Sequence, residues 1–182
     1  MGAQVESAVA ALVARLRDLD SGVRWVRTAN LHLTLRFLGD AVDRNLLAPL
    51  DQGLEQIGRQ TAPFDIHAHG AGAFPNLNRP RTIWIGLAGD QLLQLAQLVE
   101  EVTVRAGFVA ERRPYTPHLT IGRMRDLRGW PPIRDLLRDA SNYDFGSASI
   151  TEMILYRSIV GGEASQYLPL ARYQLEGAPA VK

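Results

Sequence analysis

His32-Leu33-Thr34-Leu35, the first motif, recurs about half a chain length later as the second motif, His118-Leu119-Thr120-Ile121. Alternate side chains of a β-strand point to the same face. Each motif therefore places an imidazole and a hydroxyl on one side of a strand and two apolar side chains on the other. A single His-x-Thr is a weak signal, but two such motifs in a chain with only four histidines are far harder to obtain by chance. The spacing predicts two related lobes whose sheets face a shared cleft.

The segments around the two motifs have mixed helical and strand periodicity. Helices are expected at 3–19, 42–59, 90–107 and 131–139, and strands at 23–27, 31–38, 64–69, 82–87, 118–123, 145–157 and 166–175. Trp25 and Trp84 fall within these strands and are expected to pack in the core. Because the regular strand–helix alternation of a parallel sheet is missing, we expect an α+β fold. Residues 1–182 would form one bilobal domain with two antiparallel sheets facing a central cleft, helices on the outside and a pseudo-two-fold duplication.

The composition is that of an ordinary globular protein, with 46% hydrophobic and 21% charged residues. A net charge of +1 excludes a polycation that holds a long nucleic acid by its backbone, so any nucleic-acid contact should be local. The lack of cysteine excludes disulfides, thiolate zinc sites and cysteine nucleophiles. No apolar run approaches about 18 residues, and the N-terminus does not have the pattern of a signal peptide. These features predict a cytoplasmic protein that makes no membrane contact.

The polar side chains of the two motifs suit in-line displacement at phosphorus. An attacking water must lose a proton and a leaving alkoxide must gain one, and a free imidazole titrates at about 6.5. Threonine hydroxyls can donate to the non-bridging oxygens, where negative charge grows. Neither motif has carboxylates or further histidines at ligand spacing, and His67 and His69 have no third ligand nearby in sequence. We therefore expect catalysis without a metal or another cofactor.

The motifs and their flanks resemble the two-histidine phosphoesterase superfamily. The similarity is to the bacterial and archaeal RNA 2′,3′-cyclic phosphodiesterases, historically called 2′-5′ RNA ligases. It extends from Val23 to Leu175 and includes Val23-Arg24-Trp25-Val26, Asn30 to Gly39, Gly72-Ala73-Phe74-Pro75-Asn76, Ile83-Trp84-Ile85-Gly86-Leu87, Arg113 to Arg123 and Leu155-Tyr156-Arg157-Ser158. The resemblance implies a bilobal monomer that opens terminal cyclic phosphates to 2′-phosphates, with weak reversible 2′-5′ ligation in some members.

The resemblance also implies roles for the residues of the two motifs. His32 and His118 would be the acid–base pair, and Thr34 and Thr120 would donate hydrogen bonds to the phosphate. We favour His118 as the base and His32 as the acid that protonates the 3′ oxygen. The sequence leaves this last assignment open.

Four further residues are candidates for substrate binding. Arg36 shares the face of the first motif's histidine by alternation. Arg123 lies off the face of the second motif by strict alternation, and only a bend or bulge would bring it round. Arg113 and Tyr115 precede the second motif, and Tyr115 is placed to stack on a base. Each also has an ordinary interpretation, as a surface arginine or a packed tyrosine.

Two other functions fit the same residues. The enzyme could act on a small cyclic phosphate, such as ADP-ribose 1″,2″-cyclic phosphate or a cyclic nucleotide. A limited basic surface around Arg79, Arg81 and Arg113 would favour that substrate. The chain could instead be an RNA- or nucleotide-binding module without turnover, although both intact motifs argue against it.

One departure from the family pattern concerns the N-terminus. Family members usually begin with a strand resembling Arg-x-Phe-x-Ala-Leu, whereas only a few residues precede the first expected helix here. Either the chain starts late or the strand is lost. Loss would leave backbone donors and acceptors open on a neighbouring strand. This predicts a weakened lobe or self-association through an open sheet edge.

Overall fold

A computed structural model describes residues 2–19, 21–159 and 166–178 of the chain. These residues form two compact units, and each unit is assembled from three separate stretches of sequence. Unit 1 comprises Met1–Thr34, Asp65–Gly89 and Pro117–Ser149, and unit 2 comprises Leu35–Phe64, Asp90–Thr116 and Ile150–Lys182. The prediction of an α+β fold is confirmed, while a cleft between two facing sheets stays a prediction.

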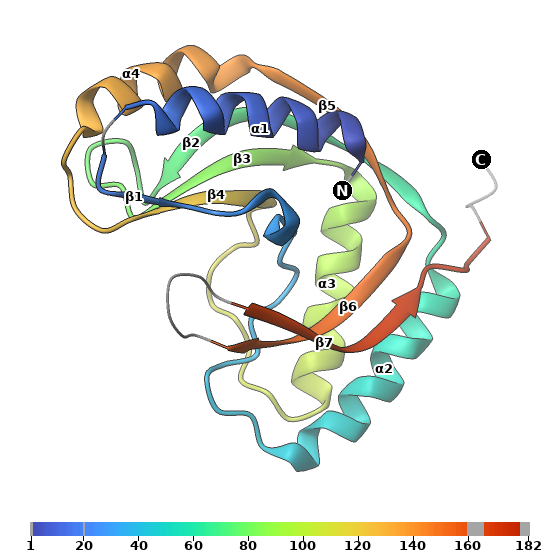
Figure 1. The fold of residues 1–182 in the computed structure, drawn as a ribbon. Coiled ribbons are helices and arrows are strands. Elements are labelled where there is room, and N and C mark those ends of the chain that lie inside the picture. The colour runs from blue at the N-terminus through green and yellow to red at the C-terminus, as the bar shows by residue number, and fades with distance from the viewer. Residues whose placement is uncertain (1, 20, 160–165, 179–182) are drawn as a thin grey trace. The chain divides into compact units, whose positions relative to one another are not determined.

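Unit 1 contains a five-stranded antiparallel sheet with the strand order β1-β4-β3-β2-β5. Helices α1 and α4 lie together on one face of this sheet (Figure 1). The elements are α1 (Ala3–Arg17), β1 (Val23–Trp25), η1 (Thr28–Asn30), β2 (Phe64–Phe74), β3 (Thr82–Ala88), β4 (His118–Met124), α4 (Trp130–Asp139), η3 (Ala140–Asn142) and β5 (Asp144–Ile150).

The core of unit 1 lies between the sheet and its two helices. Strand alternation buries Ile83, Ile85 and Leu119 completely. Helix α1 meets them with apolar residues at helical spacing, namely Val5, Val9, Leu12, Val13 and Leu16. The other face of the sheet, which we call the open face, carries Trp84. The prediction that Trp84 is a core residue is therefore wrong, because it alternates with the buried isoleucines and is only half-buried.

A bulge extends β2 beyond its predicted end. The pairing with β3 shifts between His69 and Ala71, so Gly70 has no direct partner there. Gly70 adopts φ +67° and donates its N–H to the Tyr143 carbonyl at 2.8 Å. A Cβ at this position would lie 2.6 Å from the Ser141 carbonyl oxygen, so glycine is required. The strand predicted at 64–69 thus continues to Phe74, because a bulge accommodates the glycine within the ladder.

The first motif does not form the predicted strand over residues 31–38. Only Leu33 pairs, through an isolated antiparallel bridge to Leu119 of the second motif. Upstream, the Val26 N–H donates to the Ile121 carbonyl at 2.9 Å, so β1 and the first motif follow one another along the same edge of β4. Both motifs belong to unit 1 and pair with each other. The repeat therefore does not mark two separate lobes, as its spacing predicted. A repeated sequence does not reveal whether its two copies are partners.

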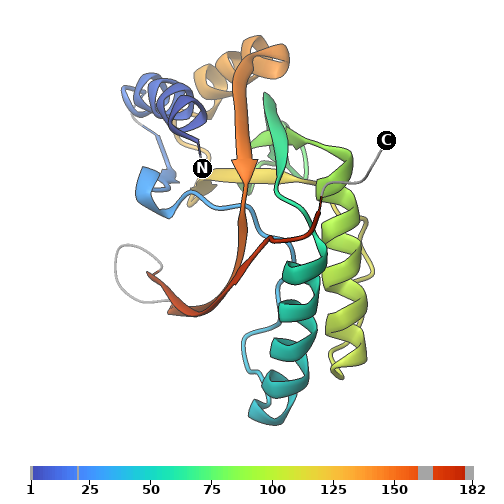
Figure 2. The same ribbon diagram turned by 90° about the vertical axis from the view of Figure 1, so that its right-hand side faces the viewer.

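Unit 2 consists of a helix pair and a two-stranded antiparallel sheet. Helices α2 (Leu47–Gln60) and α3 (Asp90–Arg105) lie side by side (Figure 2). Strands β6 (Glu152–Ile159) and β7 (Gln166–Gln174) pair with each other, and η2 (Arg44–Leu46) precedes α2. The single strand predicted at 145–157 is in fact β5 and β6, which belong to different sheets. The residues between β6 and β7, where Gly161-Gly162 predicts a turn, lie outside the described ranges.

Helix α2 packs against β7. The buried Tyr173 hydroxyl donates to the Asp51 carboxylate at 2.6 Å. A Cβ on Gly58 would lie 2.6 Å from the Gln174 carbonyl oxygen, so glycine permits this close approach of helix and strand. Burial, followed by the hydrogen bond to Asp51, raises the pKa of Tyr173.

Replacing Tyr173 with phenylalanine is expected to lower the free energy of unfolding by about 1 kcal/mol at pH 7, the usual value of one hydrogen bond. Because the pKa of Tyr173 is higher in the folded than in the unfolded state, the neutral hydroxyl stabilises the fold. This contribution is complete at pH values below the unfolded pKa, near 10, and it is lost as the pH rises toward the pKa of the folded state. The variant should therefore lose less stability than the parent between pH 9 and 11. Urea unfolding at several pH values would show this, with Tyr143→Phe as the exposed control. If Tyr173→Phe and the parent lost the same unfolding free energy between pH 9 and 11, this prediction would be contradicted.

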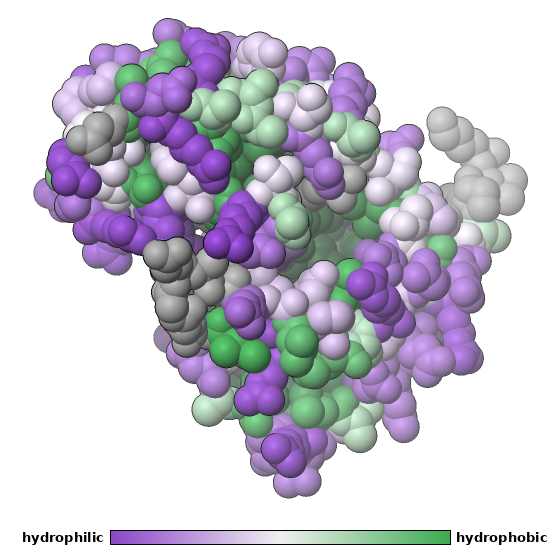
Figure 3. Space-filling view, viewed as in Figure 1, coloured by the Kyte–Doolittle hydropathy of each residue, from purple (hydrophilic) through white to green (hydrophobic). Residues whose placement is uncertain are grey.

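Hydrophobic side chains gather over the β6–β7 hairpin in the space-filling view (Figure 3). The exposed fractions are 43% for Ile159, 52% for Leu168 and 53% for Leu170. Both outer edges of this sheet pair with no other strand in the described part of the chain. Within the same part, no helix has the length and apolar character needed to cross a membrane.

Candidate active site

The bridge between Leu33 and Leu119 brings the two motifs together in unit 1. In an antiparallel pair, the residues on either side of a bridged pair are also opposite one another. Leu119 is fully buried beneath the helices, so its sequence neighbours project from the open face of the sheet. The four polar side chains of the two motifs therefore share one face.

The register places His32 opposite Thr120 and Thr34 opposite His118. Directly opposite Cβ atoms lie about 5 Å apart, and diagonal neighbours about 7–8 Å apart. The two histidines consequently occupy one diagonal of a four-residue square, and the two threonines occupy the other. His32, His118 and Thr120 are half-buried, whereas Thr34 is exposed.

A backbone carbonyl fixes the His32 ring. Its Nδ1 lies 2.8 Å from the Asn30 carbonyl oxygen. A carbonyl only accepts hydrogen bonds, so Nδ1 carries the proton and donates. The exchangeable site is then Nε2, as in many catalytic histidines. The 3₁₀ turn η1, which ends at Asn30, supplies this carbonyl.

The His118 ring contacts an aromatic side chain instead. The Phe74 ring centroid lies 5.0 Å away, with the two planes at 82°. Phe74 is the last residue of β2 and shares the open face, because it pairs with Thr82. An edge-to-face contact of this kind restricts the orientation of the imidazole.

A second bulge, in β4, determines which face of the sheet Arg123 projects from. The pairing of β3 with β4 shifts so that Trp84 is opposite Thr120 and Thr82 is opposite Arg123, which leaves Ile121 as the extra residue. Beyond the bulge the alternation of β4 is reversed. Arg123 therefore projects from the open face with Trp84 and Thr120, as a bulge was expected to allow.

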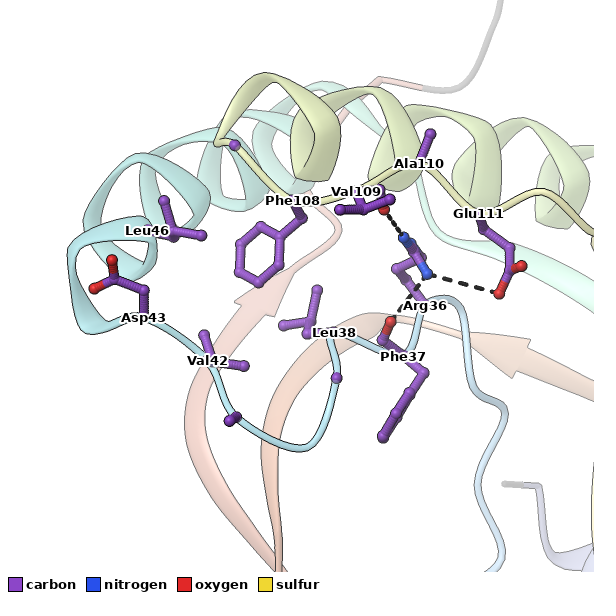
Figure 4. Close-up of a pocket in the computed structure, with 13 residues that line it drawn as sticks. Arg36, Phe37, Leu38, Val42, Asp43, Leu46, Phe108, Val109, Ala110 and Glu111 are labelled. Atoms are coloured by element: carbon purple, nitrogen blue, oxygen red, sulfur yellow. Dashed lines mark hydrogen bonds and ion pairs between the residues drawn. The ribbon is translucent and has the colours of Figure 1, made fainter.

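Arg36 belongs to unit 2, where acidic and carbonyl groups surround its guanidinium. It forms an ion pair with Glu100 at 2.5 Å. Figure 4 shows its ion pair with Glu111, at 3.8 Å, and its hydrogen bond to the Val109 carbonyl. Arg36, Val109 and Glu111 border a pocket of about 450 Å³ that is otherwise mostly apolar. The alternation that placed Arg36 beside His32 fails, because no strand continues past Thr34. A role in substrate binding stays a prediction.

The other two candidates also lie in unit 2. Arg113 is exposed and donates to both carboxylate oxygens of Glu111. This pairing lowers the pKa of Glu111 to about 2 and raises the pKa of Arg113. Tyr115 is half-buried, and burial raises its pKa. Their roles toward a substrate likewise stay predictions.

All four histidines of the chain project from the open face of the same sheet. His69 pairs with Gly86, which pairs in turn with His118 on β4, and His67 lies two residues before His69. His67 contacts Ser147 and Asp144 at 3.2 and 3.4 Å, respectively. In the described ranges, no three His, Asp or Glu side chains cluster closely enough to hold a metal ion.

Phe74 and Trp84 are the open-face residues that the sequence interpretation missed. The signal was present, because Ile83, Ile85 and Leu87 already alternate as a buried set. Trp84 must then lie on the opposite face, beside Thr120. Tryptophan is highly buried on average, and that preference points to the opposite face from the one this alternation gives.

Comparison with known proteins identifies the family of this chain. Residues 2–84 match the family model described as LigT-like phosphoesterase. The RNA 2′,3′-cyclic phosphodiesterase of Aeropyrum pernix is 33% identical over 172 residues, which cover 91% of this chain and 95% of the relative. The enzyme of the same name from Archaeoglobus fulgidus is 36% identical over 155 residues, or 85% of each chain.

Solved structures share the fold. A protein of Thermus thermophilus aligns with a TM-score of 0.82 at 25% identity, covering 97% of this chain and 94% of its own. E. coli LigT in its apo form aligns with a TM-score of 0.74 at 25% identity, covering 96% and 92%. The complex of E. coli LigT with 3′-AMP gives 0.69 at 26% identity, with 93% and 92% covered.

The α+β fold and these matches define the chain as a phosphoesterase, and hence as an enzyme. The two relatives share more than 30% sequence identity with this chain, over most of its length and most of their own, which narrows the class to one family. The chain belongs to the LigT-like family of RNA 2′,3′-cyclic phosphodiesterases. The family resemblance of the two motifs is thereby confirmed.

Proposed function

We propose that this enzyme hydrolyses RNA 2′,3′-cyclic phosphate ends to 2′-phosphomonoesters, with the two motifs as its catalytic groups. The diagonal arrangement of His32 and His118 on the open face carries this proposal. In-line displacement requires the attacking and leaving oxygens on opposite sides of the phosphorus. Two imidazoles on a diagonal, with the phosphate between them, meet that requirement.

In the proposed reaction, His118 removes a proton from the attacking water as the new P–O bond forms. The P–O3′ bond breaks, and His32 donates a proton to the departing 3′ oxygen. The products are a 2′-phosphate and a free 3′-hydroxyl. The Asn30 carbonyl holds the His32 Nδ1–H throughout, so Nε2 is the site that loses and regains its proton.

Thr34 and Thr120 occupy the other diagonal of the square. Their hydroxyls are placed to donate hydrogen bonds to the non-bridging phosphate oxygens, where negative charge increases as water attacks. If the 5′-hydroxyl of a second RNA replaces water, the same groups form a 2′-5′ linkage. Weak reversible ligation is therefore part of the proposal.

The decisive experiment incubates a short RNA ending in a 2′,3′-cyclic phosphate with the enzyme, with and without EDTA. We expect a 2′-phosphate product, identified by chromatography against 2′- and 3′-phosphate standards, and the same rate in both conditions. A 3′-phosphate product would overturn the assignment of the leaving oxygen. Loss of activity in EDTA would overturn the metal-free mechanism.

One observation favours a small cyclic phosphate as a second candidate substrate. The charge of Arg113 is paired with Glu111, which weakens the basic surface expected to contact RNA. ADP-ribose 1″,2″-cyclic phosphate should then be hydrolysed with a kcat/KM at least equal to that of a short RNA. A lower value would leave RNA ends as the preferred substrate.

Self-association through an open sheet edge stays a prediction, and we propose the β6–β7 sheet as the place where it occurs. The sheet has two unpaired edges among the described residues, and Leu168 and Leu170 are more than half exposed. We expect a dimer at high concentration, weakened by Leu170→Lys because a charge disfavours edge pairing. Light scattering after size exclusion would measure it, with Leu127→Lys, at an exposed site in unit 1, as the control. A monodisperse, fully active monomer at high concentration would contradict this prediction.

A further inference from the structure

An aromatic surface adjoins the four polar side chains on the open face. Trp84 of β3 pairs with Thr120 on one side and with Gly72 on the other. Phe74 lies two residues beyond Gly72 on β2. The Phe74 and Trp84 ring centroids are 5.2 Å apart, with 34° between the planes. We call this pair the aromatic platform.

Gly72 and Gly86 leave the space that the Trp84 indole occupies. A Cβ on Gly72 would be 2.5 Å from Cζ2 of Trp84, so the ring covers the backbone of β2 at the glycine. A Cβ on Gly86 would lie 3.5 Å from Cζ3 of the same ring. The indole is therefore directed toward β2 and away from Thr120. The hydroxyl of Thr120 stays uncovered by its cross-strand neighbour.

Packing alone does not explain a tryptophan at this position. Its Nε1 is shielded from solvent and finds no hydrogen-bond acceptor among the residues that the structure describes. Burying an unpaired donor costs stability, so an aliphatic residue would serve the fold better. The rest of the side chain is only half-buried, on the face opposite the core.

We propose that the aromatic platform stacks the base of the nucleotide that carries the cyclic phosphate. This inference rests on the proposed function. Adjacent strands are about 5 Å apart, so a phosphate held at Thr120 and His118 leaves its base over β3 and β2. Aromatic side chains that stack on bases are the usual means of binding single-stranded RNA. Stacking accepts any base, and it is strongest for purines, which have the larger ring surface.

The contact of Phe74 with both rings links the platform to catalysis. Phe74 touches Trp84 on one side and His118 on the other. A base stacked on the platform would therefore sit beside the imidazole that acts on its own phosphate. Binding of the base and orientation of the phosphate would be coupled through one residue.

The test compares two dinucleotides that end in a 2′,3′-cyclic phosphate, one with adenine at the terminal position and one abasic there. Trp84→Leu should raise KM for the adenine substrate by about 10-fold, since loss of one aromatic stacking contact weakens binding by roughly 5- to 150-fold. For the abasic substrate, the change should be less than about 2-fold on the same reasoning. Trp84→Phe, which keeps an aromatic ring, should recover much of the difference. An equal effect of Trp84→Leu on both substrates would overturn the platform.

A binding measurement separates this inference from the proposed function. Adenosine 2′-monophosphate should quench the tryptophan fluorescence of the parent, and the quenching should be lost in Trp84→Phe. Gly72→Ala should weaken the quenching, because it displaces the ring without removing it. Lack of hydrolysis with intact quenching would count against the proposed function alone. Hydrolysis without quenching would count against the platform alone.

Discussion

Replacing His32 or His118 with alanine is expected to lower kcat for RNA 2′,3′-cyclic phosphate hydrolysis by about 1,000-fold, within the range of general acid–base catalysis. Each replacement removes one of the two proton transfers, and the opposite imidazole cannot reach both sides of the phosphorus. KM should change little, because the threonines and the aromatic platform remain. Single-turnover kinetics with a short labelled RNA would measure the chemical step.

The chain supplies its own matched controls for this experiment. His67 and His69 project from the same face of the same sheet, two strands from His118. His67→Ala and His69→Ala should leave kcat within about 3-fold of the parent, because neither ring is part of the four-residue square. The double variant His32→Ala/His118→Ala should be little slower than either single variant, since the two histidines act as a unit. Activity near the parental value in either single variant would refute the mechanism.

Replacing Thr34 or Thr120 with valine is expected to lower kcat by about 100-fold, the usual effect of losing one donor to a developing oxyanion. Valine keeps the branched shape and the strand preference of threonine, so the loss should reflect the hydroxyl alone. Both variants should unfold at nearly the same urea concentration as the parent. The same single-turnover assay would measure the chemical step.

Thr82→Val is the control for the threonine variants. Thr82 is also a half-buried threonine on the open face, and its cross-strand partner is Arg123 rather than a residue of either motif. Its replacement should leave kcat within about 2-fold, because no bound phosphate oxygen is within its reach in the proposed complex. If all three threonine variants lost the same activity, the sheet rather than specific hydroxyls would be responsible.

The contrast between the two faces of one sheet explains how the fold supports this site. Ile83, Ile85 and Leu119 fill the core beneath α1 and α4 and hold the strands in register. His118 and Thr120 alternate with Leu119 on β4, so the same packing that stabilises unit 1 also fixes the positions of these two proposed catalytic side chains. Rigid strands hold catalytic groups more accurately than loops do.

Local sequence determined the α+β class, the helices and most strands of this protein. Residues that alternate along a strand or recur at helical spacing carry this information by themselves. The same alternation put the imidazole and hydroxyl of the second motif on one face. The repeated motif and its flanks were also sufficient to indicate the family.

Only the tertiary structure decided which strands are partners and where their alternation is interrupted. The bridge between Leu33 and Leu119 brings the two motifs together, and the bulge at Ile121 turns Arg123 to the open face. The division of 145–157 between two sheets and the pairing of Arg36 with Glu100 have the same origin. Strand partners, bulges and ion pairs depend on residues far apart in the chain. Periodicity within one segment contains no information about them.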